Sequence, residues 1–196
     1  SPHQSFPQLK LMILAEIENC KNGLPSGIWL KCNSLVDHRL IGLLYEASQV
    51  GVPIEIMARG VCCLRPGVAG LSETITVRSI IGRFLEHGRI YVFANGGEFL
   101  SDKNIVMISS ADLMPRNLRR RVECFMRLEN PTIRKQVLHQ IMVALLRDEK
   151  NAWYLQPDGS YVHPQTDEAS FSCHEYFMSN PSLSGLGSLA ATQDNG

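Results

Sequence analysis

The apolar positions of the first 59 residues switch twice between a helical and a strand-like spacing. Pro7 suits the first turn of a helix, and the apolar residues that follow it recur at helical intervals. The same interval returns over residues 40–51, where a glycine ends the pattern. Continuous apolar runs at 27–33 and 53–59 predict short buried strands. The order helix, strand, helix, strand favours a layered α/β fold.

Residues 60–88 are less regular. The stretch 60–72 is rich in glycine and predicts a long loop at the carboxyl end of the second strand, where α/β folds usually bind ligands. Apolar residues at helical spacing then predict a third helix over residues 77–85, which ends near Gly88.

Strand and turn patterns dominate residues 89–163, with one long helix among them. Apolar runs predict strands at 89–94, 105–109 and 122–128. Asn130 is placed to cap the start of the long helix, whose apolar side runs to Leu146. The turn residues at 157–159 predict a small hairpin.

A change of composition near residue 165 divides the chain. Residues 1–165 hold the regular patterns and are expected to form one domain, while residues 166–196 predict a polar, partly flexible tail. No apolar run reaches the ~18 residues that span a bilayer, and the first residues do not resemble a signal peptide. Because the chain opens at Ser1 without Met, we expect a fragment or a processed product.

The net charge is zero, which gives no general attraction to nucleic acid, so we expect no nucleic-acid partner. The segment from Arg59 to Arg121 nevertheless holds nine arginines, one lysine and five acidic residues, a local formal charge of +5. Guanidinium groups match phosphate oxygens two at a time. This excess is consistent with a phosphate-bearing ligand and equally with ordinary ion pairs on exposed helix faces.

Six cysteines are present, and none forms a CxxC pair or precedes a histidine at zinc-finger spacing. We therefore expect no protein metal ligands, and we expect a reducing, cytoplasmic location. Cys32, Cys62, Cys63 and Cys124 lie in or beside apolar runs, so we expect all four to be small buried residues.

Two candidate groups surround the glycine-rich loop. His87 lies between Arg83 and Arg89, where an imidazole could protonate a phosphate oxygen or attack phosphorus itself. Arg59 ends the second strand and Arg65 follows in the loop, so both could reach a crevice above the sheet. The alternatives are a structural or exposed histidine and, for Arg65, a loop-closing salt bridge.

A third candidate group follows the strand at 105–109. Small hydroxyl residues there would let backbone N–H groups approach an anion. Arg121 and Glu123 would share one face of the strand predicted at 122–128, from which the carboxylate could hold a histidine ring. The alternative is an exposed arginine run paired with nearby acids. Because no P-loop, GxGxxG or GxSxG motif is present, arginine and histidine would have to handle any phosphate.

Three long segments resemble one protein family. They are KCNSLVD at 31–37, MARGVCCLRPGVAGLSETITVRSIIGRFLEHGRIYVFANGG at 57–97 and ISSADLMPRNLRRRVE at 108–123. They look like the carboxy-terminal domain of polyphosphate kinases of the histidine-phosphorylated class, and the likeness extends over residues 1–165. The resemblance implies a phospholipase D-like layered α/β fold, with a mixed β-sheet flanked by helices.

The family transfers the γ-phosphate of ATP reversibly to inorganic polyphosphate, so the resemblance implies ATP, ADP, polyphosphate and Mg²⁺ as ligands. It also implies preceding domains, one of which carries the phosphorylated histidine in an HxK motif. None of the six histidines here is followed two residues later by Lys. Further implications are a homo-oligomer and a cytoplasmic enzyme that associates peripherally with the inner membrane.

The resemblance also implies individual roles. Arg59 is expected to bind ATP phosphates, His87 to act beside them in acid–base chemistry, and Arg121 and Glu123 to occupy polar positions of a degenerate phospholipase D motif. This chain has SSAD and HGR where true phospholipase D enzymes have GSxN and HxK. We therefore expect part of a polyphosphate kinase that is inactive alone. The alternatives are an isolated module that binds polyphosphate or nucleotide and, less favoured, a phosphodiesterase.

Overall fold

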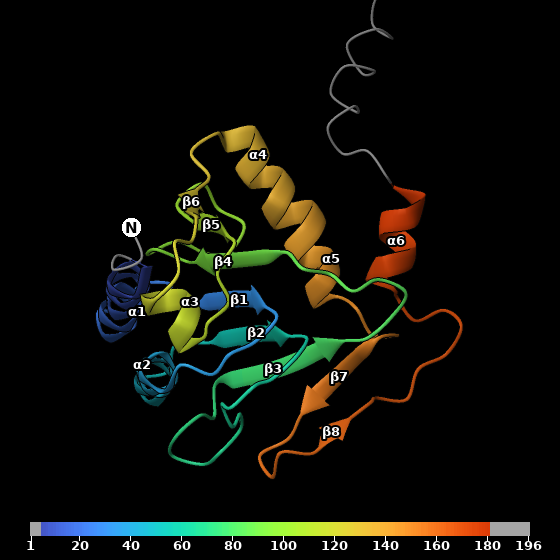
Figure 1. Ribbon diagram of the computed structural model, residues 1–196, viewed down its shortest axis with the longest axis horizontal. Coiled ribbons are helices and arrows are strands. Elements are labelled where there is room, and N and C mark those ends of the chain that lie inside the picture. The colour runs from blue at the N-terminus through green and yellow to red at the C-terminus, as the bar shows by residue number, and fades with distance from the viewer. Residues whose placement is uncertain (1–4, 181–196) are drawn as a thin grey trace, which may run out of the picture.

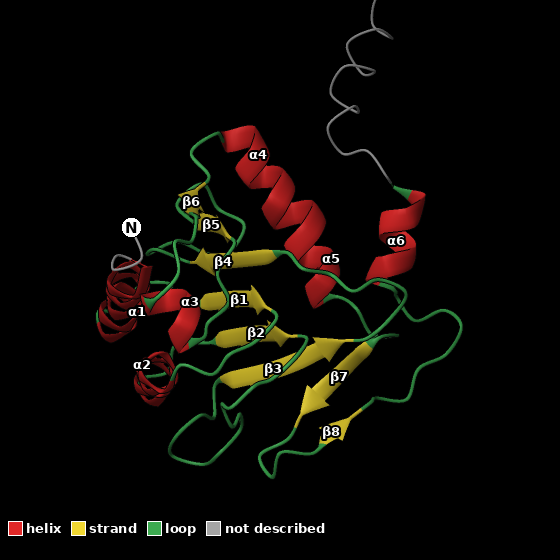
Figure 2. Ribbon diagram, in the orientation of Figure 1, coloured by secondary structure: helices red, strands yellow, loops and turns green. Residues whose placement is uncertain are grey.

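The structure is a computed structural model that describes residues 5–180. Within that range, an eight-stranded mixed sheet lies between two groups of helices, which confirms the expected α/β fold (Figures 1 and 2). The strands are β1 (Ile28–Cys32), β2 (Ile54–Ala58), β3 (Ile75–Ile80), β4 (Arg89–Phe93), β5 (Ile105–Ser109), β6 (Phe125–Arg127), β7 (Ala152–Leu155) and β8 (Tyr161–Val162). The helices are α1 (Ser5–Lys21), α2 (His38–Gln49), α3 (Pro115–Arg119), α4 (Pro131–Lys135), the π-helix η1 (Gln136–Met142), α5 (Val143–Leu146) and α6 (Cys173–Ser179).

The strand order determines which loops meet. The order is β6-β5-β4-β1-β2-β3-β7-β8, with β1, β2 and β3 parallel, β4 antiparallel to β1, and β5 antiparallel to β4. The carboxyl ends of β1, β2, β3 and β5 therefore lie at the same edge of the sheet as the amino end of β4. We call this edge, which is marked by Ser109, Arg89, Cys32, Ala58 and Ile80, the carboxyl edge.

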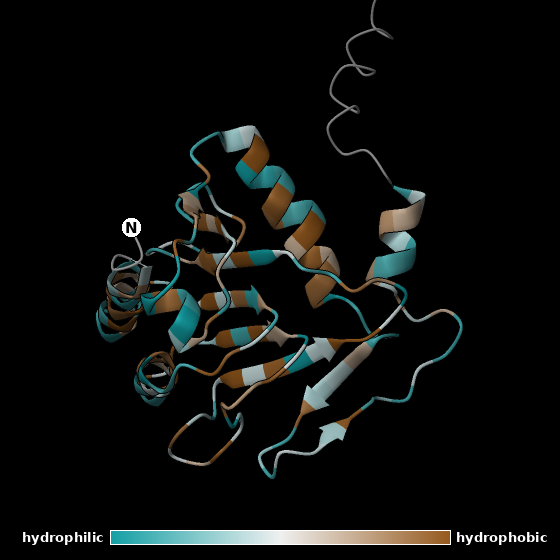
Figure 3. Ribbon diagram, viewed as in Figure 1, coloured by the Kyte–Doolittle hydropathy of each residue, from teal (hydrophilic) through white to brown (hydrophobic). Residues whose placement is uncertain are grey.

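Both faces of the central strands are buried. Ile56 of β2 packs with apolar residues of α1 and α2, while its neighbour Met57 packs with those of η1, α5 and α6. Because neighbouring strand residues point to opposite faces, the two groups of helices cover opposite faces of the sheet. This double burial explains why apolar residues occupy both faces of the central strands, where Figure 3 shows brown segments among white and teal ones.

Polar residues define where two helices begin and where one strand ends. Asp37 accepts two backbone N–H bonds at the start of α2, and Asn130 does the same at the start of α4, as predicted for Asn130. The consecutive elements α4, η1 and α5 form the long helix expected after Asn130. Asn95 and Gly96 both have positive φ in the turn after β4, a conformation that asparagine and glycine tolerate.

The helix predicted over residues 77–85 is wrong. The apolar residues up to residue 80 belong to β3, and residues 81–88 form a loop that leads directly into β4. Ile81 and Leu85, which completed the helical pattern, are 61% and 77% exposed. A buried strand followed by an exposed apolar loop produced the spacing of a helix, and periodicity alone does not separate the two.

The strand predicted over 122–128 is shorter than expected, since β6 holds only Phe125–Arg127. Residues 121–124 have no regular structure. The expectation that Arg121 and Glu123 share a strand face is therefore wrong, because strand alternation does not apply to them.

The prediction that four cysteines are buried is half wrong. Cys32 is buried and Cys62 is partly buried, but Cys63 and Cys124 are exposed. The two exposed thiols stand in irregular segments beside strands rather than within them, so their apolar neighbours in sequence do not cover them.

Residues 166–180, which the composition assigned to a polar tail, contain helix α6. Cys173 and His174 of this helix are buried, and the Cys173 N–H donates to Asp148 Oδ2 at 2.7 Å. The part of the tail expected to be flexible, residues 182–196, lies outside the described residues. Between residues 5 and 180, no helix combines the length and the apolar character needed to cross a membrane.

Candidate functional site

Three polar side chains meet at the carboxyl edge. Asn33 follows β1, Arg59 follows β2, and His87 lies in loop 81–88 just before β4. Because β1 lies between β2 and β4 in the sheet, Asn33 stands between the other two positions. The fold thus joins residues that are 26 and 54 positions away from Asn33 in the sequence.

Asn33 holds the guanidinium group of Arg59. The Nε and Nη2 atoms of Arg59 donate to Asn33 Oδ1 at 3.1 and 3.0 Å. Arg59 Nη2 also lies 3.4 Å from His87 Nε2, and Asn33 Nδ2 lies 3.5 Å from His87 Nδ1. Throughout residues 5–180, no carboxylate forms an ion pair with Arg59. The charge of Arg59 is therefore positioned but not neutralised.

His87 faces two hydrogen-bond donors. The oxygen of the Asn33 amide accepts from Arg59, so the amide turns its NH₂ group toward His87 Nδ1, while Arg59 Nη2 faces His87 Nε2. A neutral imidazole has one acceptor nitrogen and one N–H. Whichever ring nitrogen of a neutral His87 carries the hydrogen, that N–H points at another donor rather than at an acceptor. An anionic oxygen between His87 and Arg59 would accept from both groups, which makes the pair suited to phosphate.

A second arginine at this edge is neutralised. Arg89 Nε and Nη2 donate to Asp112 Oδ1 and Oδ2 at 3.1 and 3.0 Å, and the Asn33 N–H donates to Oδ1 at 2.8 Å. Burial by itself raises the pKa of Asp112, but the hydrogen bonds from Arg89, Asn33 and Ser34 and the charge of Arg89 hold this pKa below its ordinary value. The Asp112–Arg89 pair thereby fixes the backbone that presents Asn33.

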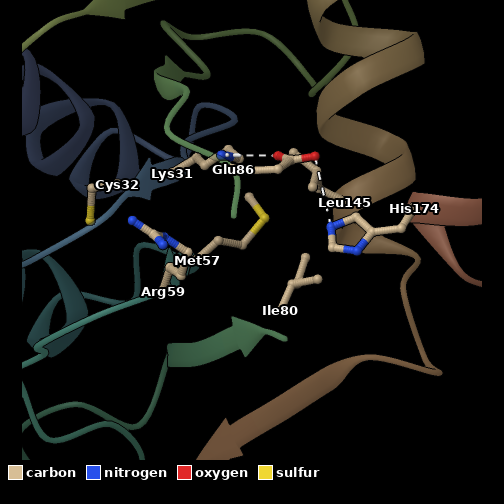
Figure 4. Close-up of a pocket in the computed structure, with 8 residues that line it drawn as sticks. All are labelled: Lys31, Cys32, Met57, Arg59, Ile80, Glu86, Leu145 and His174. Carbon is tan, nitrogen blue, oxygen red and sulfur yellow. Dashed lines mark ion pairs between the residues drawn. The ribbon is translucent and has the colours of Figure 1, made fainter. Parts of the chain in front are cut away.

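A small pocket lies beside Arg59 and is lined by Lys31, Glu86 and His174 among others (Figure 4). Its volume of about 20 Å³ leaves room for one water molecule. Glu86 Oε2 lies 3.2 Å from Lys31 Nζ, and Glu86 Oε1 lies 3.9 Å from His174 Nε2. Lys31 and His174 thus hold loop 81–88 through the carboxylate of Glu86.

Glu123 and Arg121 also lie at this edge, before the start of β6. The carboxylate of Glu123 accepts hydrogen bonds from Ser110 Oγ and from Asn117 Nδ2, the latter at 2.7 Å. These contacts occupy the carboxylate, and it is Asn33 rather than Glu123 that reaches His87 Nδ1. The Arg121 side chain is exposed to solvent.

Arg65 lies in a different neighbourhood. Its guanidinium group packs closely against the backbone of Gly159 in the turn between β7 and β8. Its backbone N–H donates to the hydroxyl of Tyr45 in α2 at 2.9 Å. These contacts close the loop at 60–72 against the hairpin, so the role of Arg65 in phosphate binding stays a prediction.

The oxygen atoms of Asn33 and Asp112 at this edge are not available as metal ligands. Asn33 Oδ1 accepts from Arg59, and both carboxylate oxygens of Asp112 accept from Arg89. In the described part of the chain, no three His, Cys, Asp or Glu side chains are grouped to hold a metal. Mg²⁺ prefers several oxygen ligands, whereas this edge presents N–H groups.

Asn33, Lys31 and His174 are not among the residues predicted from the sequence. Asn33 directly follows a predicted strand, and a strand end of an α/β fold is a position where a polar side chain could have been noted. Lys31 lies within a strand, where a lone lysine usually faces solvent. His174 lies in the predicted polar tail, and no local pattern distinguishes it.

A mixed sheet with helices on both faces defines this chain as an α/β domain. Its match to a solved polyphosphate kinase supports the expected phospholipase D-like fold. A family model described as "Polyphosphate kinase C-terminal domain 2" matches residues 1–173. The chain therefore belongs to the polyphosphate kinase family, which confirms the resemblance.

Several relatives agree with this assignment. The chain is 55% identical over 172 residues to a polyphosphate kinase of Erythrobacter litoralis and 50% identical over 179 residues to one of Synechocystis sp.. These alignments cover 88% and 90% of this chain but 24% of each relative, so the chain spans about a quarter of their length. The crystal structure of polyphosphate kinase from Porphyromonas gingivalis matches with a TM-score of 0.81 and 34% identity, over 89% of this chain and 26% of that chain.

Proposed function

We propose that this chain forms one side of the active site of an enzyme that transfers the γ-phosphate of ATP reversibly to inorganic polyphosphate. The observation that supports this proposal is the Asn33–Arg59–His87 cluster, which presents N–H groups that no carboxylate neutralises within residues 5–180. Membership of the family supports ATP, ADP and polyphosphate as the ligands of this cluster.

Arg59 and His87 would act on the transferring phosphate. Phosphoryl transfer depends mainly on positioning and electrostatic stabilisation, and one such donor contributes about 3 kcal/mol, or about a hundredfold in rate. Arg59, held in place by Asn33, would stabilise charge on the phosphate oxygens. His87 would donate a hydrogen bond or a proton to a phosphate oxygen and take it back in the reverse direction.

The nucleophile would lie on a preceding domain. The resemblance assigns the phosphorylated histidine to an HxK motif, which this chain lacks. That histidine would attack the γ-phosphorus while the bond to the bridging oxygen breaks and ADP leaves, and polyphosphate would then take the phosphoryl group. Arg121 and Glu123 would line the same edge, with Glu123 holding Ser110 and Asn117 in place.

Mg²⁺ would enter with ATP, bound by phosphate oxygens rather than by this chain, since the donors here do not fit it. A cytoplasmic homo-oligomer that associates peripherally with the inner membrane is part of the same proposal and rests on the family alone.

The first test compares ATP-to-polyphosphate transfer by the 196-residue chain with transfer by the longer enzyme that contains the preceding domain. We expect activity only in the longer enzyme, because the nucleophile would lie outside this chain. Turnover by the 196-residue chain alone would make His87 a nucleophile and would overturn the division of roles between two domains.

The second test uses variants of the longer enzyme. His87→Ala should lower kcat by about a hundredfold, as for loss of a general acid–base group, with a smaller change in ATP affinity. Arg59→Lys keeps the charge but loses the fork that Asn33 holds, so kcat should also fall. Arg120→Lys, at an exposed position outside the cluster, is the matched control. A normal rate in His87→Ala would contradict the acid–base role.

The alternative functions predict other results. Retention of labelled polyphosphate by the 196-residue chain, with no transfer by the longer enzyme, would support a binding module. Cleavage of a model phosphodiester would support a phosphodiesterase, which the HGR and SSAD sequences disfavour.

A further inference from the structure

Loop 81–88 carries His87 but has no regular structure of its own. Ile81, Leu85 and His87 are exposed, so few apolar contacts restrain this segment. The direction of the His87 side chain therefore depends on contacts that other parts of the chain make with the loop. Local order in such a segment comes from its anchors rather than from its own hydrogen bonds.

One anchor is Lys31, a buried residue of β1. Its ammonium group lies 3.2 Å from Glu86 Oε2 and donates to the backbone oxygen of Gly88 at 2.9 Å. Glu86 and Gly88 are the two neighbours of His87 in the chain. A single ammonium group thus holds the side chain of the residue before His87 and the backbone of the residue after it. Because a buried charge is costly without partners, Lys31 strongly favours the loop conformation that satisfies it.

The other anchor is His174, of which 2% is exposed. The Phe84 N–H lies 3.5 Å from His174 Nδ1, and the two rings meet edge to face at 5.3 Å between centroids. Gly82 lies so close to His174 that a β-carbon there would overlap the imidazole. On its other side, His174 Nε2 lies 3.9 Å from Glu86 Oε1. His174 therefore contacts every second residue of the loop from Gly82 to Glu86.

The two nitrogens of His174 face different groups. With Nδ1 accepting from the Phe84 N–H, the proton of a neutral His174 would be carried by Nε2, which faces the Glu86 carboxylate. Glu86 thus lies between two partners, with Lys31 at one oxygen and His174 at the other, as the dashed lines in Figure 4 show. Lys31 comes from β1 and His174 from α6, so two distant elements hold this one carboxylate.

We propose that His174 and Lys31 are positioning residues that hold loop 81–88 through Phe84, Glu86 and Gly88 and thereby aim His87 at the phosphate. The aiming of His87 at a phosphate rests on the proposed function, whereas the ordering of loop 81–88 does not. Within residues 5–180, His174 forms no hydrogen bond or ion pair with Arg59 or His87, so its effect would be transmitted by the loop.

The experiment uses two readouts on the longer enzyme. The first is the kcat and the KM for ATP in polyphosphate synthesis, and the second is hydrogen–deuterium exchange of the peptide that covers residues 82–88. His174→Phe keeps the ring and its contact with Phe84 but removes both nitrogens. It should lower kcat by about tenfold or more with KM changed less than threefold, since misplacement by about 1 Å costs up to about a hundredfold. Exchange in 82–88 should become faster while the central strands stay protected.

Two further variants separate positioning from folding. His174→Asn keeps an acceptor near the place of Nδ1 for the Phe84 N–H, and it should restore most of the protection and of kcat that His174→Phe loses. Glu86→Gln removes the charge held by Lys31 at a partly exposed position, so it should fold and reproduce the loss in both readouts. Glu175→Gln is the control, because Glu175 belongs to the same helix but pairs with Lys150 at the surface.

The outcomes distinguish the two proposals. Wild-type kcat and wild-type exchange in both His174→Phe and Glu86→Gln would overturn the positioning role. Equal losses in His174→Asn and His174→Phe would show that an acceptor at the place of Nδ1 does not order the loop, and would also overturn it. If the unaltered enzyme transfers no phosphate, the proposed function fails, while the exchange measurement still decides whether His174 and Glu86 order the loop.

Discussion

Arg59 and Arg89 stand two strands apart at the same edge of the sheet, but they meet different partners. Arg89 forms a two-pronged ion pair with the carboxylate of Asp112, whereas Arg59 donates to the neutral amide of Asn33. A carboxylate cancels the charge of a guanidinium group, and an amide orients it without cancelling the charge. The neighbouring side chain therefore decides which arginine is structural and which is available to an anion.

The Asp112 ion pair makes a prediction about stability and pH. The pKa of Asp112 is lowered in the folded state, so its contribution is present above the unfolded-state pKa of about 3.9 and is lost as the pH falls through the folded-state value. Asp112→Asn should reduce the free energy of unfolding by about 2 kcal/mol at pH 7, and by less at pH 3. Urea unfolding at both pH values measures this. Asp102→Asn, at an exposed carboxylate, is the control, and an equal loss at both pH values would contradict the argument.

The cysteines make a prediction about reactivity. Burial raises the pKa of Cys62 to about 11 and raises the pKa values of Cys32 and Cys173 as well. Only the thiolate is nucleophilic, so these thiols should react slowly at pH 8. Cys63 and Cys124 are exposed and should be alkylated first, as peptide mass spectrometry after brief treatment with N-ethylmaleimide would show. Early labelling of Cys32 in the folded protein would contradict the burial described here.

At the scale of elements, helix starts and strand ends position the site. The long helix that begins at Asn130 buries Leu138 and Leu145 against the face of the sheet opposite to α1 and α2. Leu145 also lines the pocket that holds Lys31, Glu86 and His174 (Figure 4). The register of this helix therefore affects how loop 81–88 is supported.

The helix cap at Asn130 can be tested separately. Its side chain accepts hydrogen bonds from the N–H groups of Thr132 and Ile133, which would otherwise lack a partner within the helix. Asn130→Ala should lower the free energy of unfolding by about 1 kcal/mol, and Asn130→Asp should retain most of it. Chemical denaturation of the two variants compares them directly. Equal stability of Asn130→Ala and the unaltered protein would rule out a capping contribution.

At the scale of the whole molecule, the sheet gathers the loops that follow β1, β2, β3 and β5 at one edge, and the last described helix contacts one of them, loop 81–88. Asp148 accepts hydrogen bonds from the backbone N–H groups of Asn151 and Cys173, which ties α6 to the start of β7. Cys173 packs into the core that also contains Met57 and Leu145. Residues beyond 165 thus contribute to the core and to the support of the site.

Removal of α6 should therefore be costly. A chain that ends at Gln165 loses the burial of Cys173, the hydrogen bond from the Cys173 N–H to Asp148 and the His174 anchor. We expect a lower melting temperature and faster exchange in loop 81–88 than in a chain that ends at Asn180. Calorimetry and hydrogen exchange of the two chains measure this. Identical melting of both chains would place the domain boundary near residue 165, as the composition predicts.

The sequence alone determined the features that local spacing controls. The apolar runs at 27–33 and 53–59 predict β1 and β2, because burial on both faces of a strand leaves a continuous apolar run. The cap at Asn130 is predicted because its chemistry is local. Arg59 and His87 were identified by their positions beside a strand end and among arginines. The segment 77–85 was assigned to a helix because a strand and an exposed apolar loop together imitate a helical period.

Only the tertiary structure decided which residues act together. Asn33 meets Arg59 because β1 and β2 are neighbours, and Lys31 meets Glu86 because loop 81–88 returns over β1. His174 reaches this loop from a segment whose composition predicts a tail. Glu123, predicted from strand alternation to face a histidine, instead holds Ser110 and Asn117. Local patterns encode periodicity and capping, whereas contacts between distant residues depend on strand order and packing, which no local window contains.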